Sequence, residues 1–307
     1  MHIAFGPIAP EFGSWSWIGA DLADALSDRH DVETFTNEAP AAETIVFVKF
    51  KPALDELHAL SRHCTLVFCP VDIYGSAAEI DADWRSLRQC DLIVTHCERL
   101  GKYLAAYAPT RYLDHHLKFV APLEPSRPNG GPILWIGNQS NLPPLNAWLS
   151  RHALPGELWV LTDMPAGAGT VSATDLGIPR HVKGRTARWT AERHIEWTAL
   201  ARGAIEVKGS DFRARHKSPA KAHDFIASGL PIAVNREAAA VTFLRDRGFE
   251  VADPTEPDRW LSEPYWRATQ AYGARLRAEL SLQQVAARLE SLLDEARQRH
   301  LRRAGVT

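Results

Sequence analysis

The chain has 307 residues, of which 45% are hydrophobic and 23% are charged, and its formal net charge is −2. This length and composition indicate a globular protein with room for two α/β domains of ordinary size. The small net charge and the lack of a long basic run argue against a nucleic-acid-binding protein. No stretch of the sequence approaches the roughly 20 apolar residues of a membrane-spanning helix.

The four cysteines, Cys64, Cys69, Cys90 and Cys97, all fall in the first third of the chain. Their spacing is not that of a zinc site, and the first residues do not carry the basic and apolar pattern of a signal peptide. We therefore expect reduced thiols in a cytoplasmic protein. The short basic segment QRHLRRAG near the end leaves a peripheral contact with the inner membrane surface as an additional option.

The first half of the chain alternates short apolar strands with amphipathic helices. Strands are expected at residues 2–5, 32–35, 44–50, 65–69 and 91–95, and helices at residues 17–27, 53–62 and 98–107. This alternation predicts a doubly wound domain with a parallel sheet.

A long loop joins the first strand to the first helix and carries Gly13, Ser14, Trp15 and Ser16, followed by Trp17. It lacks G-x-G-x-x-G, so we assign no dinucleotide site. Exposed indole rings in this loop can stack on a sugar or on an apolar ligand. Burial of one or both rings against the next loop is an equally weighted alternative.

Polar residues follow two of these strands, at the end where α/β sheets bind ligands. Asp72 stands just past the strand at 65–69, and His96 follows the strand at 91–95. Both are candidates for a functional role, although Asp72 can equally cap the following turn. The adjacent pair His115 and His116 would face opposite sides of a strand, so at most one of them reaches a site, and we assign no metal.

Residues 121–132 (APLEPSRPNGGP) form the one break in composition and are the expected linker. Beyond them the pattern restarts with a strand at 133–136, followed by Gly137 and Asn138 and a helix from about residue 142. We therefore predict a first domain over residues 1–122, a linker over 123–132, a second domain over 133–262 and C-terminal helices over 263–307. A dimerisation helix is the alternative for the last segment.

The segment from His216 to Asn235 carries the strongest local signals. Ser218 and Pro219 are typical of a helix start, and Gly229 is a natural helix end because it can take a positive φ. A short apolar run then predicts a buried parallel strand. The N-terminus of such a helix suits a phosphate, and four basic residues precede it, Lys208, Arg213, Arg215 and Lys217. The alternative is an ordinary capped helix with solvated lysines.

This segment resembles a known motif. A lysine-containing turn, then K-x-x-[ED], an apolar turn and G-x-P before a strand is similar to the donor-site helix of GT-B glycosyltransferases, in particular the nucleotide-sugar-dependent group 1 family. Here the matching residues are Lys221, Asp224, Gly229 and Pro231. The resemblance implies two Rossmann-like doubly wound α/β domains with a cleft between them, and C-terminal helices that cross back to the first domain.

The resemblance also implies individual roles. The residues implied to bind the nucleotide-diphosphate donor are Gly137, Asn138, Arg213, Arg215, Lys217, Ser218, Lys221 and Asp224, and those on the acceptor side are Gly13, Ser14, Trp15 and Ser16. Asp224 would hold the ribose, because it lies about 7–8 Å down the helix from Pro219. In the family's Glu-x7-Glu signature the first position is His216 here, and the second is Asp224, one methylene shorter than glutamate.

The catalytic candidates are therefore His216 near the donor sugar, Lys221 on the leaving diphosphate and, if the reaction inverts, a base among Asp72, His96 and Glu11. We expect a metal-independent glycosyltransferase of carbohydrate biosynthesis that needs no cofactor beyond its nucleotide-sugar co-substrate. Its acceptor would be a small molecule, a glycan or a glycolipid. A sugar-nucleotide epimerase of the same fold and a non-catalytic binding protein are the alternatives. The sequence does not fix the nucleotide, the stereochemical outcome or the oligomeric state.

Overall fold

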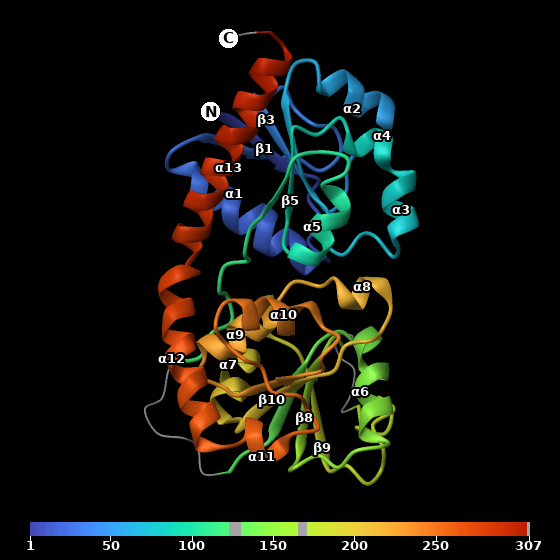
Figure 1. Ribbon diagram of the computed structural model, residues 1–307, viewed down its shortest axis with the longest axis vertical. Helices are drawn as coiled ribbons and strands as arrows, with labels where there is room; N and C mark the ends of the chain where they lie inside the picture. The colour runs from blue at the N-terminus through green and yellow to red at the C-terminus, as the bar shows by residue number, and fades with distance from the viewer. Residues whose placement is uncertain (123–129, 165–170, 306–307) are drawn as a thin grey trace. The chain divides into compact units, whose positions relative to one another are not determined.

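Two parallel sheets, each covered by helices, carry the fold (Figure 1). The computed structural model describes residues 1–122, 130–164 and 171–305. Its chain divides into two compact units. Unit 1 is built from Met1–His116, Asp211–Ser218 and Leu280–Thr307, and unit 2 from Leu117–Ser210 and Pro219–Glu279. The predicted fold class, two doubly wound α/β domains, is confirmed.

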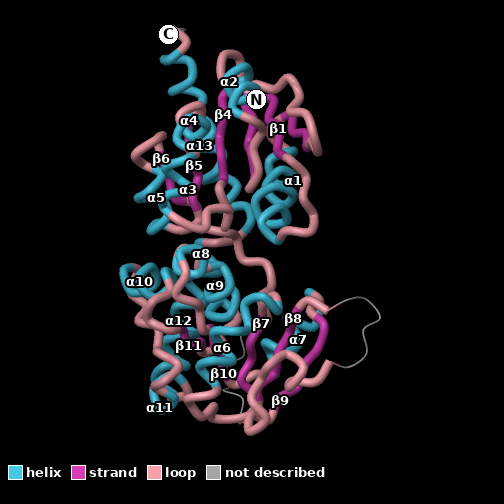
Figure 2. Tube along the Cα trace, turned by 90° about the vertical axis from the view of Figure 1, so that its right-hand side faces the viewer, coloured by secondary structure: helices cyan, strands magenta, loops and turns pink. Residues whose placement is uncertain are grey.

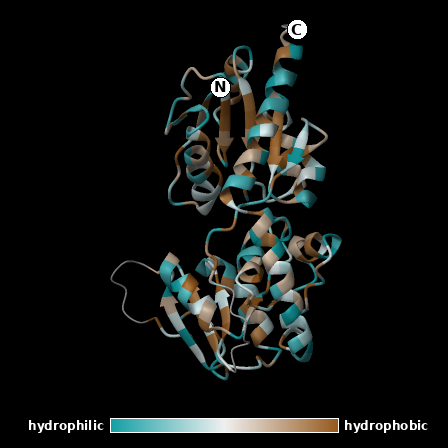
Figure 3. Ribbon diagram, turned by 90° about the vertical axis from the view of Figure 1, so that its left-hand side faces the viewer, coloured by the Kyte–Doolittle hydropathy of each residue, from teal (hydrophilic) through white to brown (hydrophobic). Residues whose placement is uncertain are grey.

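The sheet of unit 1 has the strand order β2-β1-β3-β4-β5-β6, and every pair is parallel. Its strands are β1 (His2–Gly6), β2 (Asp31–Thr34), β3 (Thr44–Val48), β4 (Thr65–Cys69), β5 (Leu92–Thr95) and β6 (Thr110–Tyr112). Every residue of β3, β4 and β5 is buried. Parallel strands covered on both faces read as unbroken apolar runs, and the strand arrows of this unit are mostly brown in Figure 3.

Helices cover this sheet and include one from the end of the chain. The helices of unit 1 are α1 (Asp21–Ser27), α2 (Leu54–Leu60), α3 (Ala77–Ala82), α4 (Trp84–Leu87), α5 (Glu98–Leu104) and α13 (Leu282–Arg303), and the short α8 (Phe212–Arg215) groups with the same unit. Helix α13 packs on α1 and β4. His300 and Arg303 on it pair with the buried carboxylate of Asp91 at 3.4 and 3.2 Å. The expected return of the C-terminus to the first domain is therefore confirmed for α13.

The sheet of unit 2 has the order β11-β10-β7-β8-β9, again parallel throughout. Its strands are β7 (Ile133–Ile136), β8 (Leu158–Thr162), β9 (Gly184–Arg188), β10 (Gly203–Glu206) and β11 (Ile232–Val234), and Figure 2 shows the first three side by side. Its helices are η2 (Gln139–Asn141, a 3₁₀ turn), α6 (Leu142–Leu149), α7 (Ala191–Leu200), α9 (Ala220–Ala227), α10 (Ala239–Asp246), α11 (Pro257–Trp260) and α12 (Glu263–Glu279).

Helix α9 is fixed at its C-terminal end and along its length. Gly229 has φ 69°, its N–H donates to the carbonyl of Ile226, and the N–H of Leu230 donates to the carbonyl of Phe225. These two hydrogen bonds form a Schellman motif, and the predicted helix end at Gly229 with a positive φ is confirmed. Helix α12 packs so closely on α9 that a Cβ atom added at Gly273 would overlap with the carbonyl oxygen of Ile226.

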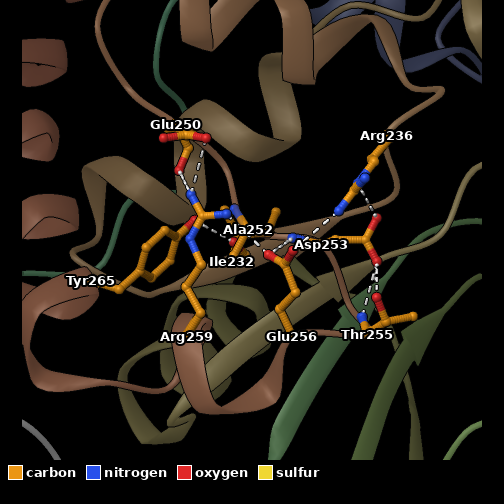
Figure 4. Close-up of polar contacts among 9 residues, drawn as sticks. All are labelled: Ile232, Arg236, Glu250, Ala252, Asp253, Thr255, Glu256, Arg259 and Tyr265. Atoms are coloured by element: carbon orange, nitrogen blue, oxygen red, sulfur yellow. Dashed lines mark hydrogen bonds and ion pairs between the residues drawn. The ribbon is translucent and has the colours of Figure 1, made fainter.

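A polar network closes the edge of unit 2 next to β11 (Figure 4). The buried Tyr265 hydroxyl donates to the carbonyl of Ile232 at 2.7 Å and accepts the N–H of Ala252 at 3.1 Å. Around it Glu256 pairs with Arg236 at 3.1 Å and with Arg259 at 3.0 Å. One phenol thus joins two buried backbone segments through a carbonyl of one and an N–H of the other. Ala252 also forms a single parallel bridge with Ala233 of β11.

The observed division of the chain differs from the predicted boundaries in three places. Residues 117–122 group with unit 2, where Asp224 and Ser228 bind their backbone. Helix α12 also groups with unit 2, because of its close packing on α9. Residues 211–218 group with unit 1, where Phe212 contacts Tyr103. Residues 123–129 of the predicted linker lie outside the described residues.

Candidate functional site

Four residues meet at the carboxyl ends of β7 and β10 and the N-terminal end of α9 in unit 2. They are Gly137, Glu206, Lys208 and Lys221, which we call the lysine cluster. Nζ of Lys208 lies 2.6 Å from Oε1 of Glu206, and Nζ of Lys221 lies 3.2 Å from the same oxygen. Nζ of Lys221 is also 3.3 Å from where a Cβ on Gly137 would stand. The structure therefore brings together two residues that the sequence proposed separately, Gly137 and Lys221.

The carboxylate of Glu206 is the buried centre of the cluster, with 4% of the residue exposed. Burial alone would raise its pKa, but the ammonium groups of Lys208 and Lys221 lower the pKa of Glu206 to about 2. The carboxylate is therefore charged at neutral pH, and the three side chains together carry one net positive charge. Such a charge at the carboxyl edge of a parallel sheet favours an anionic ligand.

Helix α9 adds to this positive field. It begins at Ala220 with Pro219 at the N-cap, and within the part of the chain that the structure describes no side chain caps it. The predicted cap by Ser218 is therefore wrong: the helix starts one residue later than expected, with Pro219 rather than Ser218 at the N-cap. Uncapped N–H groups and the helix dipole both favour a phosphate.

Sequence reasoning missed three residues of this region. Glu206 read only as part of a strand. Asn235 clamps the main chain of Lys208, since its Oδ1 accepts the Lys208 N–H at 2.7 Å and its Nδ2 donates to the Lys208 carbonyl at 3.1 Å. The Trp135 ring lies 5.7 Å from Nζ of Lys221. Only Glu206 could have been found from the sequence, because a charged residue at the end of a buried strand is unusual. Asn138, proposed beside Gly137, is exposed at the start of η2.

Asp224 lies in the interior of unit 2, with 2% of the residue exposed. Burial raises the pKa of Asp224 to about 7, and the backbone N–H groups of Lys118 and Phe119 oppose that rise. Oδ1 accepts the N–H of Lys118 at 3.1 Å. The structure thus gives this side chain an anchoring role toward the 117–121 segment. Its expected contact with a ribose stays a prediction.

An aromatic group in the same unit surrounds His194 near Lys221. The Phe119 ring lies 5.1 Å and the Phe225 ring 5.8 Å from the imidazole, and the indole N–H of Trp189 donates to Nδ1 at 3.3 Å. Burial and then the charge of Lys221 lower the pKa of His194 to about 3. His194 is therefore neutral, with its proton on Nε2.

Of the residues that precede α9, Arg213, Arg215, His216 and Lys217 belong to unit 1, whereas Lys208 belongs to unit 2. His216 stacks on Phe212 at 4.0 Å, Nδ1 lies 2.6 Å from the Phe212 carbonyl, and the Tyr103 ring is 5.4 Å away. The pKa of His216 is lowered, and burial is the largest cause. Arg213 and Arg215 are exposed, and Lys217 is half-buried. The expected approach of Arg213, Arg215 and Lys217 to a donor diphosphate, and of His216 to the donor sugar, stays a prediction.

The carboxyl ends of β3 and β4 in unit 1 carry two charged residues in left-handed backbone conformation. Lys49 has φ 66° and Asp72 has φ 52°. Nζ of Lys49 donates to the carbonyl of Val71 at 3.0 Å and lies 4.7 Å from the centroid of the Phe12 ring. Asp72 was proposed from the sequence. Lys49 was missed, because no sequence pattern marked its backbone conformation.

His96, at the end of β5, is 5% exposed, and burial lowers its pKa to about 4. Its Nδ1 lies 2.7 Å from the carbonyl of Leu113, which fixes the proton on Nδ1. Nε2 then carries a lone pair and has no partner among the described residues. The rings of His96 and His115 lie 4.4 Å apart.

The loop predicted to hold the acceptor is largely helical. Gly13 and Ser14 begin a helical turn, and Trp15–Ala20 form a π-helix that leads into α1. The ring of Trp15 fills the space above Gly19 and is 7% exposed, so the option of an exposed Trp15 is wrong. Ser16 is half-buried, and Glu11 is exposed. Insertion of an extra residue per turn, as in a π-helix, is frequent at functional sites.

Among the residues described, no group of three or more His, Cys, Asp and Glu side chains could hold a metal ion. Within the same residues, no helix has the length and hydrophobicity needed to cross a bilayer.

Comparison with solved structures identifies the fold, whereas no protein-family model and no curated protein sequence matches the chain. HepE of Anabaena in complex with UDP and glucose matches with a TM-score of 0.63 at 12% identity, over 96% of this chain and 99% of HepE. Sucrose-phosphate synthase of Thermosynechococcus elongatus matches with a TM-score of 0.67 at 13% identity, over 95% and 98%. AviGT4, a glycosyltransferase of avilamycin A biosynthesis, matches with a TM-score of 0.59 at 14% identity, over 96% and 98%. The chain has the GT-B fold.

Proposed function

We propose that the protein is a glycosyltransferase whose lysine cluster binds the diphosphate of a nucleotide-sugar donor. The observation that carries this proposal is the meeting of Lys208, Lys221 and Gly137 at the uncapped N-terminus of α9. Two proteins of the same fold support it, because HepE is described with UDP and glucose and AviGT4 as a glycosyltransferase.

Departure of a sugar from a nucleotide diphosphate leaves negative charge on the diphosphate. In the proposed complex, Lys221, Lys208 and the α9 amides stabilise this charge from positions that they already hold before the reaction. Such preorganised electrostatic stabilisation supplies much of the rate of many enzymes. Glu206 holds both ammonium groups in place. Because the lysines can take over the neutralisation of the leaving group, the proposed reaction needs no metal.

Two residues of unit 1 remain candidates for a base in an inverting reaction. Asp72 is half-buried beside the ends of the central strands, and His96 keeps a lone pair on Nε2 inside the unit. The geometry of unit 1 favours Asp72, because a base must come within hydrogen-bond reach of the acceptor hydroxyl and His96 is enclosed.

A non-catalytic protein that binds a sugar nucleotide is the second candidate. One observation favours it: His216 stands where the family signature has a glutamate, and its ring is stacked on Phe212 in unit 1. Such a protein would bind the nucleotide through the same lysine cluster and form no product.

A thermal-shift screen of UDP, GDP, ADP, dTDP and CMP, with and without Mg²⁺, tests the binding site first. A nucleotide at about 100 times its Kd stabilises the folded state by about 2.7 kcal/mol, which is a shift of several degrees. Lys221→Met should weaken binding roughly tenfold to a hundredfold, because a charged hydrogen-bond partner is lost. Lys183→Met, an exposed lysine of the same unit, is the matched control and should leave binding unchanged.

The second step separates the two candidate functions. The protein is incubated with the sugar nucleotide that carries the best-binding diphosphate, and release of the diphosphate is followed with sugar acceptors present and absent. Release that needs an acceptor supports the transferase. Binding without release supports the non-catalytic protein. The lack of any nucleotide-dependent shift would refute the donor site itself.

A further inference from the structure

The ends of β3 and β4 in unit 1 hold a second positively charged site. Lys49 directly follows β3, and Asp72 follows β4 three residues after its last residue. Among the described residues they are the two non-glycine positions with positive φ. A left-handed conformation costs a non-glycine residue roughly 1–2 kcal/mol, and it persists where the surroundings fix it, often at ligand sites.

The ammonium group of Lys49 is held in a fixed place. Its backbone N–H donates to the carbonyl of Cys69 at 2.9 Å, and its Nζ donates to the carbonyl of Val71 at 3.0 Å. The face of the Phe12 ring lies 4.7 Å from Nζ, and the Phe50 ring meets Phe12 edge-on at 5.4 Å. An ammonium with one carbonyl partner keeps further donor capacity for a ligand.

Burial and two neighbouring charges shift the pKa of Lys49. Burial lowers the pKa of Lys49 most, the carboxylate of Asp72 raises it, and the guanidinium of Arg213 lowers it again. Arg213 is held in this region by its Nη2, which donates to the carbonyl of Ile73 at 3.2 Å. Two cations and one carboxylate leave a net positive charge, and the two cations repel one another.

Lys49 differs from Lys51, Lys208 and Lys221 in its pairing with carboxylates. Lys208 and Lys221 share the carboxylate of Glu206, and Nζ of Lys51 pairs with Asp83 at 2.8 Å. Lys49 forms no ion pair with a carboxylate of the residues that the structure describes. A partly buried ammonium without an ion pair, beside a second cation, is stabilised when an anion binds between them.

We propose that Lys49 and Arg213 form an anion-binding site against the Phe12 ring, and that it takes the carboxylate or phosphate of the acceptor. The acceptor class is then a sugar phosphate or a uronic acid, whose ring face can lie on the aromatic side chains. The existence of the anion site stands on unit 1 alone. Its assignment to the acceptor rests on the proposed glycosyl transfer.

The test follows the NMR signals of individual lysine side chains. Lysines of the whole protein are reductively ¹³C-dimethylated, and their ¹H–¹³C signals are assigned with Lys49→Met, Lys102→Met, Lys208→Met and Lys221→Met. Inorganic phosphate, glucose 6-phosphate, glucuronate and glucose are then titrated at constant ionic strength, with the donor site filled by its best-binding diphosphate or left empty. Glucose is the neutral control, and the exposed Lys102 is the control lysine.

The expected result is a saturable shift of the Lys49 signal and a rise of its pKa with the anions, but not with glucose. The phosphate and carboxylate arms distinguish the two acceptor chemistries. Lys49→Met should weaken binding of the responsive anion about tenfold. Asp72→Asn should strengthen it, because the competing carboxylate is gone while asparagine still tolerates the left-handed backbone. A purely structural Asp72 would not produce a gain.

Three results would overturn the proposal: a Lys49 signal that no anion moves, a response confined to Lys208 and Lys221, or an Asp72→Asn variant that binds no tighter. Failure of the proposed function is distinguishable from these results. It would appear as a diphosphate that does not affect Lys208 and Lys221, while Lys49 still responds to the anions.

Discussion

Replacing Glu206 with glutamine removes the carboxylate that two lysines share. The pKa of Glu206 is about 2, against an ordinary value of 4.5. By linkage this difference corresponds to about 3 kcal/mol of stability at neutral pH. Because the folded-state pKa is lowered, the contribution is present above about pH 4.5 and is lost as the pH falls toward 2. We therefore expect Glu206→Gln to lower the free energy of unfolding by up to about 3 kcal/mol at pH 7.

Urea unfolding followed by tryptophan fluorescence measures this loss. At pH 3 the native carboxylate still binds fewer protons than the unfolded one, but the difference between variant and wild type should shrink to about half its value at pH 7. Glu196→Gln, an exposed glutamate on α7, is the control and should change stability by less than about 0.5 kcal/mol. An equal loss at pH 7 and pH 3, or a loss as large in the control, would refute the role of the ion pairs.

Two further predictions concern buried polar groups of unit 2. Tyr265→Phe should lower the free energy of unfolding by about 2–3 kcal/mol, since it leaves the carbonyl of Ile232 and the N–H of Ala252 buried without this partner; an unchanged urea midpoint would contradict this. Asp224 has a pKa of about 7 in the folded state, above its ordinary 3.8, so wild-type stability from this group falls as the pH rises between these values. Asp224→Asn, which can still accept from Lys118, should gain stability relative to wild type from pH 5 to pH 7, and parallel pH profiles of the two proteins would count against the assignment.

The parts of the fold that local pattern encodes were predictable. The apolar runs at β3, β4 and β7 are buried on both faces in the structure, and such runs mark parallel strands wherever they occur. Gly229 ended its helix as expected because only glycine takes positive φ without strain. The helix start at Ser218 was less predictable, since boundaries depend on a balance of small terms within one turn.

The candidate site was only half predictable, because its other half depends on sheet order. Lys221 and Gly137 belong to motifs, so their roles could be inferred separately. Glu206 becomes the centre of the cluster because β10 lies between β11 and β7, which places strands that are distant in sequence next to one another. Lys49 could not be found at all from sequence, because a positive φ at a lysine is imposed by the packing around it and not by its own preference.

The buried carboxylate of Asp224 gives helix α9 a second task beyond the proposed donor site. A side chain one methylene shorter than glutamate stays close to the helix, and here it accepts N–H groups of the 117–121 segment. Ser228, one turn further on, accepts the N–H of Ala121. The helix whose N-terminus faces the lysine cluster therefore also fixes the segment by which the chain enters unit 2.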